Sequence, residues 1–243
     1  MANIQNARGS SFFRVANFLL VLVVSTPIFA DMRVDRAIVF FEPDAPPRQD
    51  VEVSNLSDQT LFLKVEVLEV SNAGTDQEQR RLVTDLESIG FIASPANSVI
   101  PPKGRRNIRL LNLREPGDDE RIYRVTFKPV LPELTAQTNA IKLLVAYQSL
   151  IIIRPKNVDI DVASETNTDG LRLSNNGNAN VFLQNGRACH TASKECVDLP
   201  SKRLYAGNSW TVNSGASEGK LNSEEYEISY VLNSGKNQIS KTF

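Results

Sequence analysis

The stretch NAIKLLVAYQSLIIIRP, from Asn139 to Pro155, is the most apolar segment of the chain downstream of its N-terminal region. Its first half alternates, which is typical of a β-strand because successive side chains of a strand point to opposite faces. Its second half, Leu150 to Ile153, is apolar without interruption and predicts a strand that is buried on both faces. One side of the alternating half carries Ile141, Leu143, Val145 and Tyr147, and the other carries Lys142, Leu144, Ala146 and Gln148. What covers the apolar side of that first half is the question that the sequence raises.

Strand patterns of the same kind fill the rest of the chain. Segments rich in β-branched, aromatic or alternating residues are separated by turn-forming Pro, Gly, Asn and Asp, and no segment sustains the apolar period of an amphipathic helix. The predicted strands lie in Arg33–Phe41, Asp50–Asn55, Thr60–Val70, Asn107–Leu113 and Arg121–Val130 before the opening stretch, and in Val158–Ala163, Leu171–Gly186, Glu225–Gly235 and Asn237–Phe243 after it. The last two segments predict a closing hairpin. Many short strands at regular spacing predict an all-β protein of the sandwich type.

The strand pattern restarts after Pro155, so we predict two domains, residues 31–155 and residues 156–243. Each part is long enough to bury a core of its own, and each is predicted to be an immunoglobulin-like (Ig-like) β-sandwich.

Residues 1–30 have the features of a secretory signal peptide. Arg8 and Arg14 occur there without an acidic residue, an apolar core runs from about Val15 to Val24, and the small residue Ala30 marks the expected cleavage site. The alternative is a membrane anchor, but the apolar run is shorter than the ~20 residues that a spanning helix needs. No later segment is long and apolar enough to span a membrane. We therefore expect an exported protein that is not membrane-spanning.

Two cysteines, Cys189 and Cys196, lie close together in the second predicted domain. In an exported protein such a pair most often closes a disulfide. The alternative is a metal site, which would need further ligands beside His190, the single histidine of the chain. We expect no metal and no cofactor.

Motifs for catalysis and for nucleic-acid binding are missing from the sequence. It contains no G-x-S-x-G, H-E-x-x-H, P-loop or G-x-G-x-x-G motif, and a lone histidine in a loop bounded by cysteines does not make a nucleophile–base pair. The formal net charge of -1 gives no electrostatic reason to expect nucleic acid as a partner. These observations favour a binding or structural protein over an enzyme, and an exported hydrolase is disfavoured.

Four segments, in order, resemble the periplasmic chaperones that assemble pili. They are SPANSVIPPKGRRNIRLL (Ser94–Leu111), ERIYRVTFKPVLP (Glu120–Pro132), IKLLVAYQSLIIIRP (Ile141–Pro155) and LRLSNNGNANVFLQN (Leu171–Asn185). The resemblance covers essentially the whole chain after residue 30. It implies two Ig-like domains in an L-shaped arrangement and a location in the periplasm. The disulfide in the second domain looks closer to a divergent, alternate-pilus branch of these chaperones.

The resemblance also implies a function. Such chaperones bind newly exported pilin subunits, lend them the last strand of the first domain in donor-strand complementation, and deliver them to an outer-membrane usher without a nucleotide cofactor. Here the lent strand would present Ile141, Leu143 and Val145 to the subunit, with Tyr147 as a fourth contact. The alternative is that this face packs on the protein's own core. An unpaired apolar edge also makes self-association plausible.

A basic residue is implied as the anchor for the C-terminal carboxylate of the subunit. Arg36 stands where the resemblance places that arginine, and Arg33 is a second candidate. The lysine that such chaperones carry in the last strand corresponds to Leu150 here, so Arg36 acts alone, a residue such as Lys128 substitutes, or the carboxylate is held differently.

Glu120 and Arg154 match two members of the ion-pair network that fixes the angle between the domains in this class of chaperone. The third, acidic member falls near Asn233, so we expect a reduced network; the alternative is ordinary surface charge. A rival to the chaperone function is an exported structural pilin or adhesin subunit. A pilin should lack its final Ig strand, whereas the first domain here has one.

Overall fold

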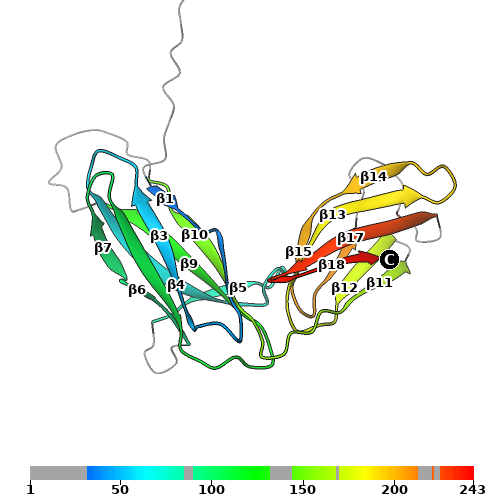
Figure 1. Ribbon diagram of the computed structural model, residues 1–243, viewed down its shortest axis with the longest axis horizontal. Helices are drawn as coiled ribbons and strands as arrows, with labels where there is room; N and C mark the ends of the chain where they lie inside the picture. The colour runs from blue at the N-terminus through cyan, green and yellow to red at the C-terminus, as the bar shows by residue number, and fades with distance from the viewer. Residues whose placement is uncertain (1–31, 85–89, 132–143, 168–169, 213–220, 222–224) are drawn as a thin grey trace, which may run out of the picture.

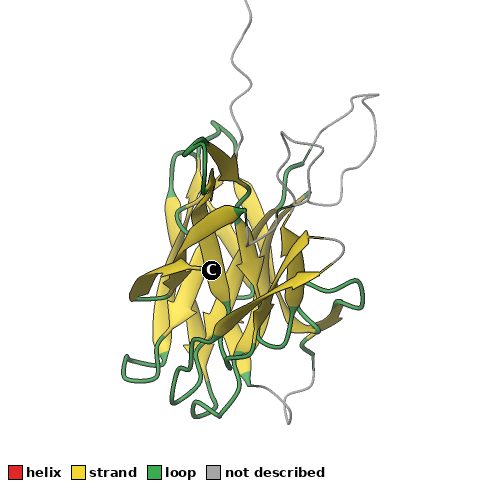
Figure 2. Ribbon diagram, turned by 90° about the vertical axis from the view of Figure 1, so that its right-hand side faces the viewer, coloured by secondary structure: helices red, strands yellow, loops and turns green. Residues whose placement is uncertain are grey.

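The computed structural model describes residues 32–84, 90–131, 144–167, 170–212, 221 and 225–243. Every regular element in these ranges is a β-strand, and the strands form two sandwiches that meet at one end and diverge from there (Figure 1). A view from the side of the second sandwich shows the strands stacked in layers with loops at their ends (Figure 2). The prediction of an all-β protein with two Ig-like sandwiches set at an angle is confirmed.

The first sandwich packs a four-stranded sheet against a six-stranded sheet. Alternate residues of the facing strands form one core, in which Val51, Ile108 and Val125 have no exposed surface. In spatial order, the four-stranded sheet contains β1 (Met32–Val34), β3 (Arg48–Asn55), β8 (Arg105–Asn112) and β6 (Phe91–Ser94). The six-stranded sheet contains β2 (Ile38–Phe41), β10 (Tyr147–Ile153), β9 (Arg121–Val130), β4 (Leu61–Ser71) and β5 (Gln79–Leu82), and β7 (Asn97–Ile100) also pairs with β4.

The prediction of one strand over Arg33–Phe41 is wrong, because the segment forms two strands in different sheets. β1 pairs with β3, whereas β2 runs parallel to β10 in the opposite sheet. The charged pair Asp35 and Arg36 interrupts the apolar alternation at this point. The Asp35 amide donates to the Glu52 carbonyl at 3.1 Å, and the chain then crosses to the other sheet. The N-terminal segment therefore contributes one strand to each sheet of the first sandwich.

β10 confirms the prediction that Leu150 to Ile153 are buried on both faces. The strand lies between β9, which is antiparallel to it, and β2, which is parallel. Ile151 and Ile153 point into the core between the two sheets. Leu150 and Ile152 point to the outer face, where a smaller cluster with Val70, Ile122, Phe40, Ala73 and Tyr205 covers them. Because Tyr205 comes from the second sandwich, the outer cluster is the apolar part of the junction.

The second sandwich packs a three-stranded sheet against a five-stranded sheet. The predicted strand at Val158 begins only at Val162, and the two strands found within Leu171–Gly186 lie in different sheets. The predicted closing hairpin is present as β17 (Tyr226–Ser234) and β18 (Asn237–Thr242). The strands of the smaller sheet are β11 (Val162–Asn167), β12 (Gly170–Asn175) and β16 (Ser209–Val212), and those of the larger are β14 (Cys196–Leu199), β13 (Val181–His190), β17 (Tyr226–Ser234), β18 (Asn237–Thr242) and β15 (Lys202–Leu204).

The predicted disulfide joins Cys189 of β13 to Cys196 of β14, whose Cα atoms are 4.0 Å apart. The two residues face each other directly in the antiparallel register. The bond therefore lies on one face of the sheet and links the two strands at the end of the hairpin.

Candidate functional site

The start of β10 has a partner strand on one side only. Pairing with β9 begins at Tyr147, but pairing with β2 begins at Leu150, whose amide donates to the Ala37 carbonyl at 2.8 Å. Backbone groups of successive residues point to alternate sides of a strand. The N–H and C=O of Gln148 therefore point away from β9, toward the side that β2 does not reach. This short open edge is the feature from which a strand of another protein could continue the sheet.

The segment before β10 is exposed and is not a strand in the described residues. Leu144 is 37% exposed and Val145 is 48% exposed. Our prediction that β structure runs continuously through Val145 into β10 is therefore wrong for the free protein. The register that places Tyr147 opposite Phe127 would place Val145 opposite Pro129. Proline has no N–H to donate, so the ladder with β9 cannot continue there.

Of the four predicted contacts of the donor strand, Val145 and Tyr147 lie among the described residues. Tyr147 is half-buried and packs against the core of the first sandwich. Val145 has the same parity as Tyr147, but it lies beyond the last β9 pair and is exposed. Ile141 and Leu143 lie outside the described residues.

Arg36 is held at the crossing between the two sheets. Its Nη1 donates to Gln49 Oε1 at 3.0 Å, its Nη2 donates to the Asp50 carbonyl, and its Nε lies 3.7 Å from Asp35 Oδ2. Its own carbonyl accepts a hydrogen bond from Ser149 Oγ at 2.6 Å, which ties it to the open end of β10. The side chain is 39% exposed, so an incoming carboxylate could reach it only in competition with these partners.

Glu120 and Arg154 form a buried ion pair where the two sandwiches meet. Arg154 Nη1 lies 2.9 Å from Glu120 Oε2, and the side chains are 1% and 5% exposed. Asn180 donates to Glu120 from its backbone amide and its side chain, and Arg154 Nη2 donates to Ser234 Oγ at 2.5 Å. The third place of the network is thus filled by neutral groups of the second sandwich. Neither Asn180 nor Ser234 was identified from the sequence, because an Asn in a turn and a Ser near a strand end carry no specific signal.

Burial raises the pKa of the Glu120 carboxyl above its usual range. The hydrogen bonds from Asn180 and the positive charge of Arg154 act in the opposite direction but are the smaller effects. A buried ion pair is a weak source of net stability, yet removal of one partner is costly. The pair therefore links the two sandwiches where they meet, and the loss of one partner alone should be costly.

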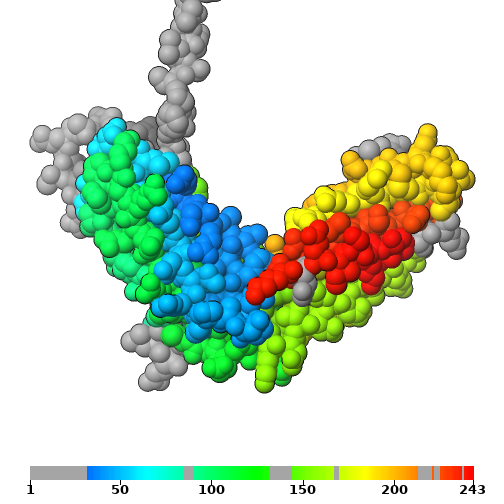
Figure 3. All heavy atoms as spheres, viewed as in Figure 1, coloured from blue at the N-terminus to red at the C-terminus, as the bar shows by residue number. Residues whose placement is uncertain are grey.

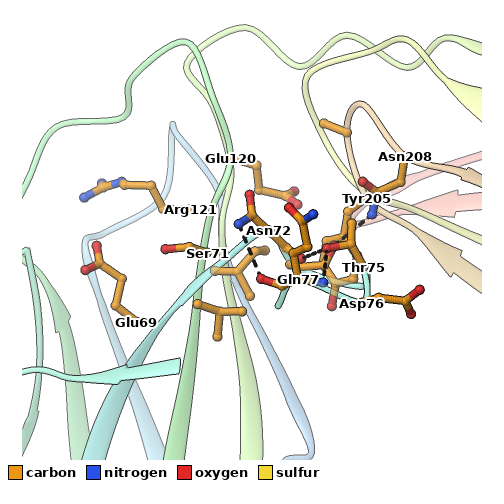
Figure 4. Close-up of a pocket in the computed structure, with 14 residues that line it drawn as sticks. Glu69, Ser71, Asn72, Thr75, Asp76, Gln77, Glu120, Arg121, Tyr205 and Asn208 are labelled. Atoms are coloured by element: carbon orange, nitrogen blue, oxygen red, sulfur yellow. Dashed lines mark hydrogen bonds between the residues drawn. The ribbon is translucent and has the colours of Figure 1, made fainter. Parts of the chain in front are cut away.

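A second contact across the junction is made by the turn after β4. Asn208 Nδ2 donates to the Ala73 carbonyl at 2.8 Å, and Tyr205 packs against Ala73 and Gly74. Beside this contact lies a polar pocket of about 710 Å³, with Glu120 and Arg121 on one side and Tyr205 and Asn208 on the other (Figure 4). Side chains from both sandwiches line it. The space-filling view shows the two lobes diverging from this junction (Figure 3).

The described residues also bear on metal binding and on membrane insertion. No group of His, Cys, Asp and Glu among them is arranged to hold a metal ion. In the same part of the chain, no helix has the length and apolar character needed to cross a membrane.

Comparison with solved structures gives the fold a family context. A class 5 fimbriae chaperone, CfaA, is 19% identical, with 87% of this chain and 98% of that chain covered and a TM-score of 0.64. A Salmonella enterica structure of the SafA pilin in complex with the SafB chaperone is 13% identical, with 90% and 99% covered and a TM-score of 0.58. The CsuC–CsuE pre-assembly complex of a chaperone and a tip adhesion subunit, from archaic Csu pili of Acinetobacter baumannii, is 13% identical, with 88% and 98% covered and a TM-score of 0.56.

Comparison of the sequence with protein families gives one match. No match was found among curated proteins. The model of one family, described as pili and flagellar-assembly chaperone, PapD N-terminal domain, matches residues 31–159, which is more than half of the chain. This is a family of chaperones rather than enzymes. The chain belongs to the family of pilus-assembly chaperones defined by the PapD N-terminal domain.

Proposed function

We propose that this protein works in the periplasm, where it binds exported pilin subunits by donor-strand complementation and delivers them to an outer-membrane usher. The observation that carries the proposal is the open edge of β10 beside the exposed Val145. Backbone hydrogen bonds along such an edge give affinity, and alternate side chains fill pockets of the partner. In this proposal a strand of the subunit pairs with the edge of β10 that β2 does not reach, and no catalysis is involved.

In this geometry Val145, which belongs to the segment that would be lent to the subunit, is available to pair with a partner strand. β9 cannot hold Val145 because its opposite residue is Pro129, so pairing with a subunit breaks no existing ladder there. The buried half of the strand, from Leu150 onward, keeps the donor attached to the rigid sandwich. Ile141 and Leu143 remain predicted contacts of the same face. The same open edge could pair with a second copy of the protein before a subunit arrives.

The test is co-expression in the periplasm with pilin subunits of chaperone–usher systems, followed by co-purification. Val145→Glu should abolish the complex, because a carboxylate would enter an apolar pocket. Ile239→Glu is the matched control, since Ile239 is also 48% exposed but lies on β18 of the second sandwich. Equal recovery of the pilin with both variants would refute the proposal.

Arg36 remains a predicted anchor for the C-terminal carboxylate of the pilin. Arg36→Ala should lower pilin recovery while the chaperone stays folded, and Arg33→Ala should not. If Arg33→Ala alone lowers recovery, the register of the anchor is misassigned.

A further inference from the structure

Ser149 places a buried hydroxyl on the side of β10 that faces the core. Its same-face neighbours Ile151 and Ile153 belong to that core, and Ser149 itself is 1% exposed. A buried hydroxyl costs free energy unless it forms a hydrogen bond. Here the hydroxyl donates to the Arg36 carbonyl at 2.6 Å. Ser149 is therefore bonded to the crossing, which we define as Asp35 to Ala37, the residues between β1 and β2.

The crossing is held from the opposite sheet as well. The Asp35 N–H donates to the Glu52 carbonyl at 3.1 Å, and Asp35 Oδ1 accepts from the Glu52 N–H at 2.9 Å. Within the described ranges, the Asp35 carbonyl accepts no hydrogen bond from Glu52. The side chain thus takes the place of its own carbonyl in the ladder with β3. This substitution ends β1 and frees the backbone to turn toward β10.

The crossing is also the segment of this chain that is nearest to the open edge at Gln148. The parallel register of β2 and β10, continued by two residues, would place Arg36 opposite Gln148. The Gln148 N–H would then donate to the Asp35 carbonyl, and the Ala37 N–H to the Gln148 carbonyl. Neither bond is present among the residues that the structure describes. A pilin strand must reach these same groups of Gln148, so the crossing is an intramolecular competitor with a high effective concentration.

The observed bonds and this competing pairing exclude each other. Backbone groups of successive residues in a strand point to alternate sides. The Ala37 carbonyl points toward β10, to which it is bonded. In a longer β2 the Arg36 carbonyl would therefore point away from β10 and lose Ser149, while the Asp35 N–H would point toward β10 and leave Glu52. Both bonds must break before the chain can cover its own edge.

We propose that Ser149 is a positioning residue for pilin binding, because its bond to Arg36 holds the crossing off β10 and keeps the edge at Gln148 free. Asp35 acts with it from the opposite sheet. The inference rests on the proposed function, since it concerns the edge to which the pilin strand is added. Affinity for a pilin is proportional to the fraction of the chaperone whose edge is free. Loss of the Ser149 hydroxyl lowers that fraction without removing a contact to the pilin.

The first test uses the free chaperone in its monomeric form. Hydrogen exchange of the Gln148 amide, measured by NMR, reports whether the crossing pairs with the edge. In Ser149→Ala the Gln148 protection factor should rise at least ~3-fold over the native protein, because a hydrogen bond that opposes the pairing is lost. A purely structural role would leave this exchange unchanged or make it faster. A protection factor that does not rise overturns the inference.

Two serine variants serve as controls. Ser149→Thr keeps the hydroxyl and should exchange like the native protein. Ser98→Ala removes a hydroxyl that is also buried in the first sandwich but has no hydrogen-bond partner, and it should leave Gln148 exchange unchanged. Equal protection of Gln148 in the Thr and Ala variants of Ser149 would mean that the hydroxyl is not the cause, and would overturn the inference.

A pair of substitutions at Asp35 repeats the test at a more exposed position. Asp35→Ala removes the bond to the Glu52 N–H and should also raise the protection of Gln148. Asp35→Asn keeps an oxygen that accepts this bond and should not. If Ser149→Ala does not fold, this pair decides the question. Equal Gln148 exchange in the two Asp35 variants would then overturn the inference.

A second arm uses a pilin that co-purifies with the native chaperone. Ser149→Ala should weaken pilin binding by the same factor by which it raises Gln148 protection in the free protein. If protection does not rise while Val145→Glu still abolishes binding, this inference fails and the proposed function stands. If protection rises but pilin affinity is unchanged, the pilin does not use this edge, and both fail.

Discussion

At the scale of single residues, Gly74 meets two requirements at once. Its φ of +74° lies in the left-handed region, and a Cβ placed there would lie 2.7 Å from Tyr205 Cδ2 of the second sandwich. Gly207 has a similar φ of +76°, but nothing lies close to it. An alanine there would therefore meet the backbone strain without the steric clash. The pair of glycines allows the energy of the close approach to be measured.

Gly74→Ala should therefore lower the free energy of unfolding more than Gly207→Ala does. Backbone strain should cost about 1 kcal/mol in each, and the clash at Gly74 should add roughly 1–3 kcal/mol. Urea unfolding monitored by circular dichroism measures both. In a Tyr205→Ala background the excess should disappear, and an excess that persists there would mean that Tyr205 is not the cause.

Glu120 gives a prediction with a defined sign. Since its folded-state pKa is raised above the ordinary value of 4.5, the folded protein holds the proton more tightly than the unfolded chain. Its contribution to stability is therefore fully present below about pH 4.5 and is lost as the pH rises through the folded-state pKa.

The difference in unfolding free energy between the native protein and Glu120→Gln should follow this course. It should be most favourable to the native protein at acidic pH and decline as the pH rises, because all other acids are common to both. Urea unfolding at a series of pH values gives the difference. A difference that increases with pH would mean that Arg154 and Asn180 outweigh the effect of burial.

At the scale of elements, the two halves of the opening stretch behave differently for reasons only partly visible in the sequence. Four adjacent apolar residues indicated burial on both faces, and this is confirmed because Leu150 and Ile152 find a second apolar layer. The start of β10 at Tyr147 could not be predicted, since it depends on Pro129 being the residue opposite Val145. The split of β1 from β2 was missed because both halves read as strand.

Ile152→Ala should destabilise the protein by about 2–5 kcal/mol, because it removes a fully buried side chain from the junction cluster. Ile239→Ala removes the same atoms from an exposed position and should change stability by less than about 0.5 kcal/mol. Thermal and urea denaturation compare the two variants. Equal effects would show that Ile152 is not buried in solution.

At the scale of the whole molecule, the two sandwiches are joined by the Arg154–Glu120 pair and by the contacts of Tyr205 and Asn208. Residue pattern and resemblance identified Glu120 and Arg154, but their partners Asn180 and Ser234 emerge only when distant strands are brought together. The sequence therefore predicted the fold better than it predicted the contacts at the junction between the sandwiches.

Tyr205→Ala combined with Asn208→Ala should loosen the junction while both sandwiches stay folded. The double variant removes the ring against Gly74 and the hydrogen bond to the Ala73 carbonyl, but keeps the Arg154–Glu120 pair. Small-angle X-ray scattering should show a broader distribution of interatomic distances than for the native protein, with an unchanged circular dichroism spectrum. Identical scattering would mean that Tyr205 and Asn208 do not restrain the angle between the sandwiches.

The central claim is that a pilin strand completes the sheet at the open edge of β10. Amide hydrogen exchange in the free chaperone and in its complex with a pilin tests this at the backbone. The Gln148 amide should exchange rapidly in the free protein and become strongly protected in the complex, whereas the Leu150 amide, bonded to Ala37, should be protected in both. A complex in which Gln148 exchanges as rapidly as in the free protein would contradict the claim.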